Sequence, residues 1–235
     1  MLPVTDEPRS RTVPYVNIGL IITNVIVFLY ELTLNDARLN NFFFDHGVVP
    51  AQLVDWFNAP SGLGEPLTVY TSAFIHGGWL HLIGNMLYLW VFGDNVEDAL
   101  GHVKYLVFYF VCAAGAVAAQ VIVDTEGAVP VVGASGAIAG VLGAYLVFYP
   151  RATVGALLGY VWYVPIPAVV VIAFWFGMQL LAGLAALGAD TVAQESIAFW
   201  AHIGGFLTGA AIAAVMRPFV RLQPIARRRR GTDMW

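Results

Sequence analysis

The stretch Val132–Gly140, with the sequence VGASGAIAG, places Ser135 among glycines at the start of an apolar run that continues to about Tyr149. A serine in an apolar helix needs no special explanation, because its hydroxyl can bond a backbone carbonyl one turn back. A second stretch, Trp200–Gly205 (WAHIGG), places His202 inside another apolar run. A histidine at membrane depth is energetically costly and indicates a functional site with a partner. We therefore predict that Ser135 and His202 are partners, nucleophile and base of a protease working inside a membrane.

The composition indicates a polytopic protein of the lipid bilayer. Of the 235 residues, 59% are hydrophobic and only 11% are charged, against roughly 25% charged residues in a soluble domain. The single cysteine, Cys112, excludes an intrachain disulfide. The sequence shows no internal repeat, no low-complexity segment and no second domain.

Six apolar segments are candidates for membrane spans, since a helix needs about 20 mostly apolar residues to cross the hydrocarbon core. They lie at about Tyr15–Leu34, Leu80–Phe92, Val103–Val123, Ser135–Tyr149, Ala168–Leu187 and Ile197–Met216. The sequence therefore predicts an all-α fold, with a six-transmembrane-helix bundle over residues 15–216. A short N-terminal segment, 1–14, precedes the bundle, and a basic tail, 217–235, follows it.

The basic residues predict the orientation of these spans. With six spans, both termini share one side, and ten of the eleven Lys and Arg residues fall on that side. Only Arg38 falls on the opposite side. Because cytoplasmic loops carry an excess of Lys and Arg, we expect both termini to be cytoplasmic. The run 227–230 is explained as a topology anchor near anionic lipid, and no nucleic-acid binding is expected.

The fourth span is too short to cross the bilayer at its full length, given a rise of about 1.5 Å per residue. Its outer end, which carries Ser135, must then lie below the membrane surface. Loop backbone at this depth is tolerated only where it lines a wet cavity or is buried in protein. The span length thus predicts a water-filled pocket that opens outward. The first outer loop, about residues 35–78, is rich in aromatic residues and is expected to lie in the interface.

Small residues line one face of each of two predicted helices: Ser135, Ala139 and Gly143 on the fourth, and His202, Gly205 and Gly209 on the sixth. Small residues on facing helices let the backbones approach closely in lipid. Docking these two faces would bring the hydroxyl and the imidazole together. The alternative, plain small-residue packing, explains the glycines but does not explain His202.

His81 and Asn85 form a second polar pair, at positions i and i+4 near the outer end of the second span. Both side chains can donate hydrogen bonds to a developing negative charge. Ser135 opens its helix, where free N–H groups and the positive end of the helix dipole also suit an oxyanion. An interfacial histidine beside a helix-packing asparagine explains the pair equally well when it is taken alone.

The other membrane-protease chemistries are not supported by the sequence. The zinc motif His-Glu-x-x-His is absent, and Asp94 is the only aspartate near a span end. We therefore expect no metal and no cofactor. The only carboxylate inside a span is Glu31, so a Ser–His dyad is favoured over a triad. His46, His76 and His102 are expected in loops or at the interface, without a catalytic part.

At this point the sequence resembles the rhomboid family of intramembrane serine proteases, and its bacterial type in particular. Four motifs carry the resemblance: GASG at 133–136, AHIGG at 201–205, HLIGN at 81–85 and VEDALG at 96–101. The resemblance covers about Leu67–Val215. Each motif alone is weakly specific, whereas all four in this order are highly specific.

The resemblance implies a six-helix rhomboid-like bundle that cleaves transmembrane segments of other proteins near the outer face of the membrane. Ser135 would be the nucleophile and His202 the base. His81, Asn85 and the Ser135 N–H would bind the oxyanion. The fifth helix and the segment 188–196 would gate substrate entry. A bacterial member would lie in the bacterial cytoplasmic membrane.

Three positions depart from the family pattern. Trp56 is followed by Phe57 where many members have Trp-Arg, Ala139 stands where some members stack an aromatic ring on the histidine, and Ser196 replaces an expected glycine. Two rival functions remain. A rhomboid-fold protein that binds membrane clients without cutting them would not need Ser135 and His202. A small transporter predicts two related halves, and none are found.

Overall fold

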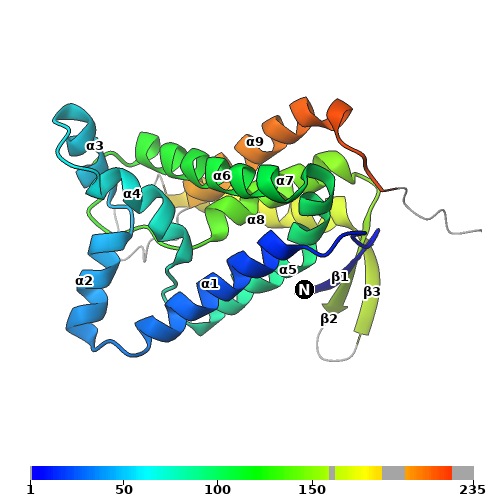
Figure 1. Ribbon diagram of the computed structural model, residues 1–235, viewed down its shortest axis with the longest axis horizontal. Helices are drawn as coiled ribbons and strands as arrows, with labels where there is room; N and C mark the ends of the chain where they lie inside the picture. The colour runs from blue at the N-terminus through cyan, green and yellow to red at the C-terminus, as the bar shows by residue number, and fades with distance from the viewer. Residues whose placement is uncertain (1, 159–161, 187–198, 224–235) are drawn as a thin grey trace, which may run out of the picture.

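The computed structural model describes residues 2–158, 162–186 and 199–223 and is mostly helical (Figure 1). The helices are α1 (Tyr15–Glu31), α2 (Asp36–His46), α3 (Pro50–Asn58), α4 (Gly64–Thr71), η1 (Ser72–Phe74), α5 (Trp79–Leu100), α6 (His102–Val123), α7 (Ser135–Phe148), α8 (Ala168–Ala186), α9 (Phe199–Met216) and η2 (Arg217–Phe219). The strands are β1 (Leu2–Glu7), β2 (Thr153–Leu158) and β3 (Trp162–Pro167). The segment 188–196 and the arginine run 227–230 lie outside the described residues.

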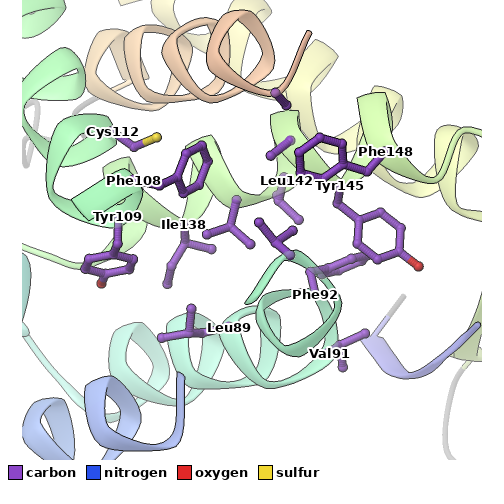
Figure 2. Close-up of a cluster of buried hydrophobic side chains, with 14 of the residues drawn as sticks. Leu89, Val91, Phe92, Phe108, Tyr109, Cys112, Ile138, Leu142, Tyr145 and Phe148 are labelled. Carbon is purple, nitrogen blue, oxygen red and sulfur yellow. The ribbon is translucent and has the colours of Figure 1, made fainter. Parts of the chain in front are cut away.

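Helix α7 is the central element of the bundle. Every residue from Gly136 to Tyr145 is buried. Side chains from α5, α6 and α7 meet in one apolar cluster, in which Leu89 and Phe92 face Ile138 and Leu142 (Figure 2). The helix has 14 residues, a length of about 21 Å, against the roughly 30 Å of a hydrocarbon core. The helix is therefore too short to cross a hydrocarbon core at full length, and the sunken outer end stays a prediction.

Helices α7 and α9 approach so closely that only glycine fits between them. A Cβ atom added at Gly205 would lie 1.9 Å from the carbonyl oxygen of Gly136. A Cβ atom added at Gly209 would lie 2.0 Å from that of Gly140. We call this contact the α7–α9 seam. It pairs the two small-residue faces that the sequence singles out, and close contact of this kind gives van der Waals packing in lipid.

The segment between α1 and α5 contains the helices α2, α3 and α4, although the sequence predicts an interfacial loop at about residues 35–78. Helix α2 is capped by Asn35, whose side chain accepts a hydrogen bond from the Arg38 N–H, and Pro50 occupies the first turn of α3. Figure 1 shows α2, α3 and α4 gathered at the end of the molecule that is far from the sheet. The bridge between Val48 and Val131 ties this end to the approach to α7.

A three-stranded antiparallel sheet of order β1-β2-β3 corrects the expectation of an all-α fold. The N-terminal strand pairs with β2, so residues 2–7 belong to the folded body. Proline lacks a ladder donor and is confined to edge strands, and the sheet follows this rule with Pro3 on β1 and Pro165 and Pro167 on β3. The sequence does not predict this sheet, because single extended strands give no periodic signal beside apolar helices.

The second predicted span is longer in the structure, because α5 runs on to Leu100. Its charged end is satisfied by protein: Glu97 is buried and accepts hydrogen bonds from the backbone N–H groups of Val16 (3.0 Å) and Asn17 (2.7 Å). These N–H groups are at the start of α1, where a carboxylate is favoured by the helix dipole. The ends of α1 and α5 are thereby fixed to each other.

Two helices in the described residues are long and apolar enough to cross a membrane by themselves, at His102–Val123 and Phe199–Phe219. Three shorter apolar helices accompany them, at Tyr15–Glu31, Ser135–Phe148 and Ala168–Leu181. The count of six spans therefore stays a prediction from the sequence. The helices expected at those positions are all present.

Candidate active site

Ser135 and His202 meet at the end of the α7–α9 seam. The His202 Nε2 atom lies 2.7 Å from the Ser135 Oγ atom, a normal hydrogen-bond distance. Ser135 is the first residue of α7, and His202 lies in the first turn of α9. Since Gly136 and Gly205 let the two backbones touch just beyond this pair, the seam fixes the distance between hydroxyl and imidazole.

The second ring nitrogen of His202 also has a partner. Its Nδ1 atom lies 2.7 Å from the Oε1 atom of Gln179, on α8. The ring of Trp175, one turn earlier on the same helix, lies 5.7 Å from the imidazole between centroids. His202 itself is 8% exposed. The imidazole is therefore held from two sides, by Ser135 on α7 and by two residues of α8.

A cavity of about 850 Å³ opens beside Ser135 and His202. Its lining also includes His81, Asn85 and Tyr88 from the first half of α5. Ile138 and Leu142 of α7 and Trp175 of α8 give it an apolar wall. The cavity thus combines a few polar groups with apolar surface, as small-molecule and peptide sites commonly do.

The cavity lies at the end of the bundle that carries α2, α3 and α4. The backbone N–H of Gly133, just before α7, donates to the carbonyl of Ser72 in η1 at 2.8 Å. The backbone N–H of Ala51 in α3 likewise donates to Gly127 at 3.0 Å. Ser135 is therefore at the end opposite the sheet and the N-terminal strand. The sequence predicts that this end of the bundle faces the outer side of the membrane.

His81 lies directly against the turn that leads into α7. Gly133 has a φ of +123°, and a Cβ atom there would lie 2.7 Å from the His81 Nε2 atom. This backbone conformation and this contact both require glycine. Asn85 is 8% exposed, and its Nδ2 atom has no hydrogen-bond partner in the described part of the chain. The structure thus leaves a buried donor at the cavity wall, close to where Ser135 begins its helix.

His76 lies in the loop between η1 and α5, as the sequence predicts, but its side chain is buried inside the protein. It is 1% exposed, and its ring lies 5.0 Å from that of His81 in an edge-to-face arrangement. Burial, together with the neighbouring His81, lowers the pKa of His76 to about 3, so its ring is uncharged at neutral pH. Its backbone N–H donates to the Glu31 carboxylate at 3.2 Å. The other two histidines do not line the cavity: His46 packs on Phe42, and His102 contacts Glu97.

No carboxylate contacts His202 within residues 2–158, 162–186 and 199–223. Glu31, the only carboxylate inside a span in the sequence analysis, holds His76 instead. In the same ranges, no three His, Cys, Asp or Glu side chains are grouped as metal ligands would be. The polar groups around His202 are neutral.

The structure brings together all four residues that the sequence selects: Ser135, His202, His81 and Asn85 all line one cavity. Two contact residues of His202 were missed, Gln179 and Trp175. Gln179 is the only strongly polar residue in the apolar helix AVVVIAFWFGMQLLAGLAA. A single polar residue in an apolar helix could have indicated Gln179 just as it indicated His202, since polar groups inside a span are costly.

Comparison with known proteins places the chain in a family. A sequence profile described as "Rhomboid domain" matches residues 63–219, more than half of the chain. "RHOMBOID-like protein 12, mitochondrial" from Arabidopsis thaliana is 29% identical over 215 residues, which is 84% of this chain and 56% of the relative. "Presenilin-associated rhomboid-like protein A, mitochondrial" from Danio rerio is 30% identical over 170 residues, 68% of this chain and 41% of the relative.

A third relative, "RHOMBOID-like protein 5" from Arabidopsis thaliana, is 35% identical over 83 residues, 35% of this chain and 27% of the relative. The chain therefore spans about a quarter to just over half of the length of these relatives.

The expectation of a bacterial type in the bacterial cytoplasmic membrane, with cytoplasmic termini, is wrong. Two of these relatives are mitochondrial proteins by name. The physical reason for the error is that the Lys and Arg distribution reports only how the spans are oriented across a membrane. It carries no information on which membrane that is.

The matched profile covers the approach to α5, the cavity and both helices of the seam, from residue 63 to 219. The chain belongs to the rhomboid family.

Proposed function

We propose that this chain is an intramembrane serine endopeptidase that cleaves transmembrane segments of other proteins. The observation that carries the proposal is the 2.7 Å contact between the Ser135 Oγ and His202 Nε2 atoms at the wall of a large cavity. A hydroxyl and a base within hydrogen-bond reach are the basic requirement of nucleophilic acyl transfer. In this proposal the six apolar helices cross the bilayer, and the names of the relatives favour a mitochondrial membrane.

The proposed reaction begins with a substrate segment in the cavity, unwound near the outer end of α7. His202 Nε2 takes the Ser135 proton while Oγ attacks the carbonyl carbon of the scissile peptide bond. The carbonyl oxygen becomes an oxyanion, and the C–N bond then breaks as His202 gives the proton to the leaving amine. Water attacks the acyl-serine with His202 again as base, which releases the second product and restores Ser135.

In this proposal three groups stabilise the oxyanion. The N–H of Ser135 is at the start of α7, where the first four N–H groups have no partner within the helix. Asn85 offers its unpaired Nδ2 donor, and His81 lies against Gly133 beside the nucleophile. Donors that are already in place when charge develops need no reorganisation, and each is worth roughly 100- to 1,000-fold in rate.

The test uses the purified full chain in detergent with a fluorogenic transmembrane substrate. Ser135→Ala and His202→Ala are each expected to lower the cleavage rate by at least about 10⁴-fold, since removal of a nucleophile or its base leaves only background catalysis. Thermal unfolding of both variants serves as the folding control. Cleavage by Ser135→Ala at the rate of the unmodified chain would rule the proposal out. Binding of the transmembrane substrate by the unmodified chain without any cleavage would instead favour a membrane protein that binds clients without cutting them.

A further inference from the structure

Gln179 on α8 is a polar group in contact with His202 that the Ser–His dyad does not use. Its Oε1 atom lies 2.7 Å from His202 Nδ1, while Nε2 of the same ring lies 2.7 Å from Ser135 Oγ. We propose that Gln179 is a positioning residue that holds His202 in the tautomer and ring orientation needed to accept the Ser135 proton. This inference rests on the proposed function and deepens it.

The tautomer follows from the donor and acceptor inventory of the three groups. A neutral imidazole has one N–H donor and one acceptor nitrogen. An amide oxygen can only accept, so the proton of the ring must be on Nδ1. The lone pair is then on Nε2 and points at the Ser135 hydroxyl. The opposite tautomer would present an N–H to Ser135 and could not act as a base.

A neutral partner suits this site better than a carboxylate. His202 is 8% exposed, and the cavity wall around it is formed by Ile138, Leu142 and Trp175. An ionised side chain in such surroundings loses much of its hydration, whereas an amide accepts the same hydrogen bond without a charge to desolvate. The amide therefore orients the ring, although it gives the imidazolium less electrostatic support than a carboxylate would.

Trp175 completes the support from the same helix. Gln179 and Trp175 are separated by four residues, which places them on one face of α8. The indole ring contacts the imidazole at 5.7 Å and also lies 6.5 Å from the ring of Tyr88 on α5. Two supports of His202 thus come from one helix. A displacement of α8 away from α9 would release the ring and leave Ser135 without an aligned base.

The first variant is Gln179→Met, which keeps the length of the side chain and removes the amide oxygen. We expect kcat to fall about tenfold, the size of one net hydrogen bond, with KM unchanged. The low-pH limb of the kcat profile should also move to lower pH, because the protonated ring loses the acceptor that favours it. Leu180→Met is the matched control: it places methionine one residue further along α8 and should leave kcat and the pH profile unchanged.

The second variant is Gln179→Glu, which keeps the acceptor and adds a charge. The carboxylate favours the protonated ring, so the low-pH limb should move to higher pH, opposite to the change in Gln179→Met. If Gln179→Met does not fold, the shift of the low-pH limb in Gln179→Glu tests the positioning role by itself. Wild-type kcat and an unmoved limb in both variants would overturn the positioning role while Ser135→Ala still abolishes cleavage. Unchanged cleavage by Ser135→Ala would instead overturn the proposed function.

Discussion

Two of the helices that pack against α9, namely α7 and α8, do so in opposite ways. Along α7 the contact is backbone against backbone, with room for nothing larger than glycine at Gly205 and Gly209. Along α8 a Cβ atom added at Gly177 would meet nothing within 4 Å, and Phe174 and Met178 are 65% and 52% exposed. The nucleophile is thus on a helix that packs backbone against backbone on the helix of the base. The orienting groups Gln179 and Trp175 are on a helix that contacts α9 through side chains, such as the ring of Phe176 on that of Phe206.

The largest expected effect comes from filling the seam. Gly209→Ala places a Cβ atom 2.0 Å from the Gly140 carbonyl, so α7 and α9 must separate. We expect the unfolding free energy to fall by about 1–3 kcal/mol and cleavage to be lost, measured by thermal unfolding and by the fluorogenic substrate. Gly177→Ala on α8 is the matched control, expected to be neutral or stabilising by about 0.5–1 kcal/mol. Equal effects of the two changes would contradict the difference between the helices.

Replacement of Asn85, which lines the cavity, should lower the activity without lowering the stability. Asn85→Leu removes a buried donor that has no partner, so stability should hold or rise by about 1 kcal/mol. In the same variant kcat should fall about 100-fold, because an oxyanion donor is lost. Asn24→Leu, at a buried asparagine of α1 that does not line the cavity, should leave kcat unchanged. A wild-type kcat in Asn85→Leu would remove Asn85 from the site.

A smaller change is expected at the turn before α7. Gly133→Ala combines a strained φ of +123° with a contact of 2.7 Å to His81 Nε2, so the imidazole must move. We expect kcat to fall about tenfold, less than for loss of a donor. Gly62→Ala tests strain alone, since Gly62 has a φ of +66° and open space around its Cβ position. If both variants lose activity equally, the His81 contact has no separate role.

The smallest expected effect concerns Asp6, which contacts α7 near the end of the helix opposite Ser135. Asp6 on β1 accepts hydrogen bonds from Tyr145 and Asn95, each at 2.6 Å. Burial raises the pKa of Asp6 to about 7 from an ordinary 3.8. The folded chain therefore holds this proton over a pH range in which the unfolded chain has lost it, and stability falls as pH rises from 4 to 7.

Asp6→Asn keeps an acceptor and removes this titration. Its Tm at pH 8 should exceed that of the unmodified chain by about 2–4 °C, and the difference should disappear near pH 4. Thermal unfolding in detergent over this pH range measures both. A Tm difference that does not change with pH would show that Asp6 stays ionised in the fold.

The helices at the six apolar segments and the Ser135–His202 pair could be predicted because each depends on a local pattern. Apolar runs give the helices, and small residues at helical spacing give the faces that dock. The sheet could not be predicted in the same way, because β1 and β2 are separated by about 145 residues of chain and neither strand alternates clearly. The full length of α5 could not be predicted, because a charged residue such as Glu97 is expected beyond the end of a span. Its burial is explained only by its hydrogen bonds to the backbone N–H groups of Val16 and Asn17, far away in the sequence.

Gln179 shows the limit of residue-type reasoning at the site. A search for a carboxylate partner of His202 finds none, and this result favoured a dyad. The structure instead places a neutral amide on His202 Nδ1. The partner of a glutamine in an apolar helix cannot be predicted from the sequence alone, since here it lies 23 residues away across a helix contact.

The most direct test of the account is the reaction of Ser135 with a fluorophosphonate probe, located by mass spectrometry. The probe reports a serine whose hydroxyl is activated and reachable from water. We predict a single adduct, on Ser135, in the folded chain, with labelling at least about 100-fold slower in His202→Ala, since a general base contributes roughly 10²–10⁴ in rate. Labelling of Ser135 at the same rate without His202, or no labelling of Ser135 in the folded chain, would contradict the account.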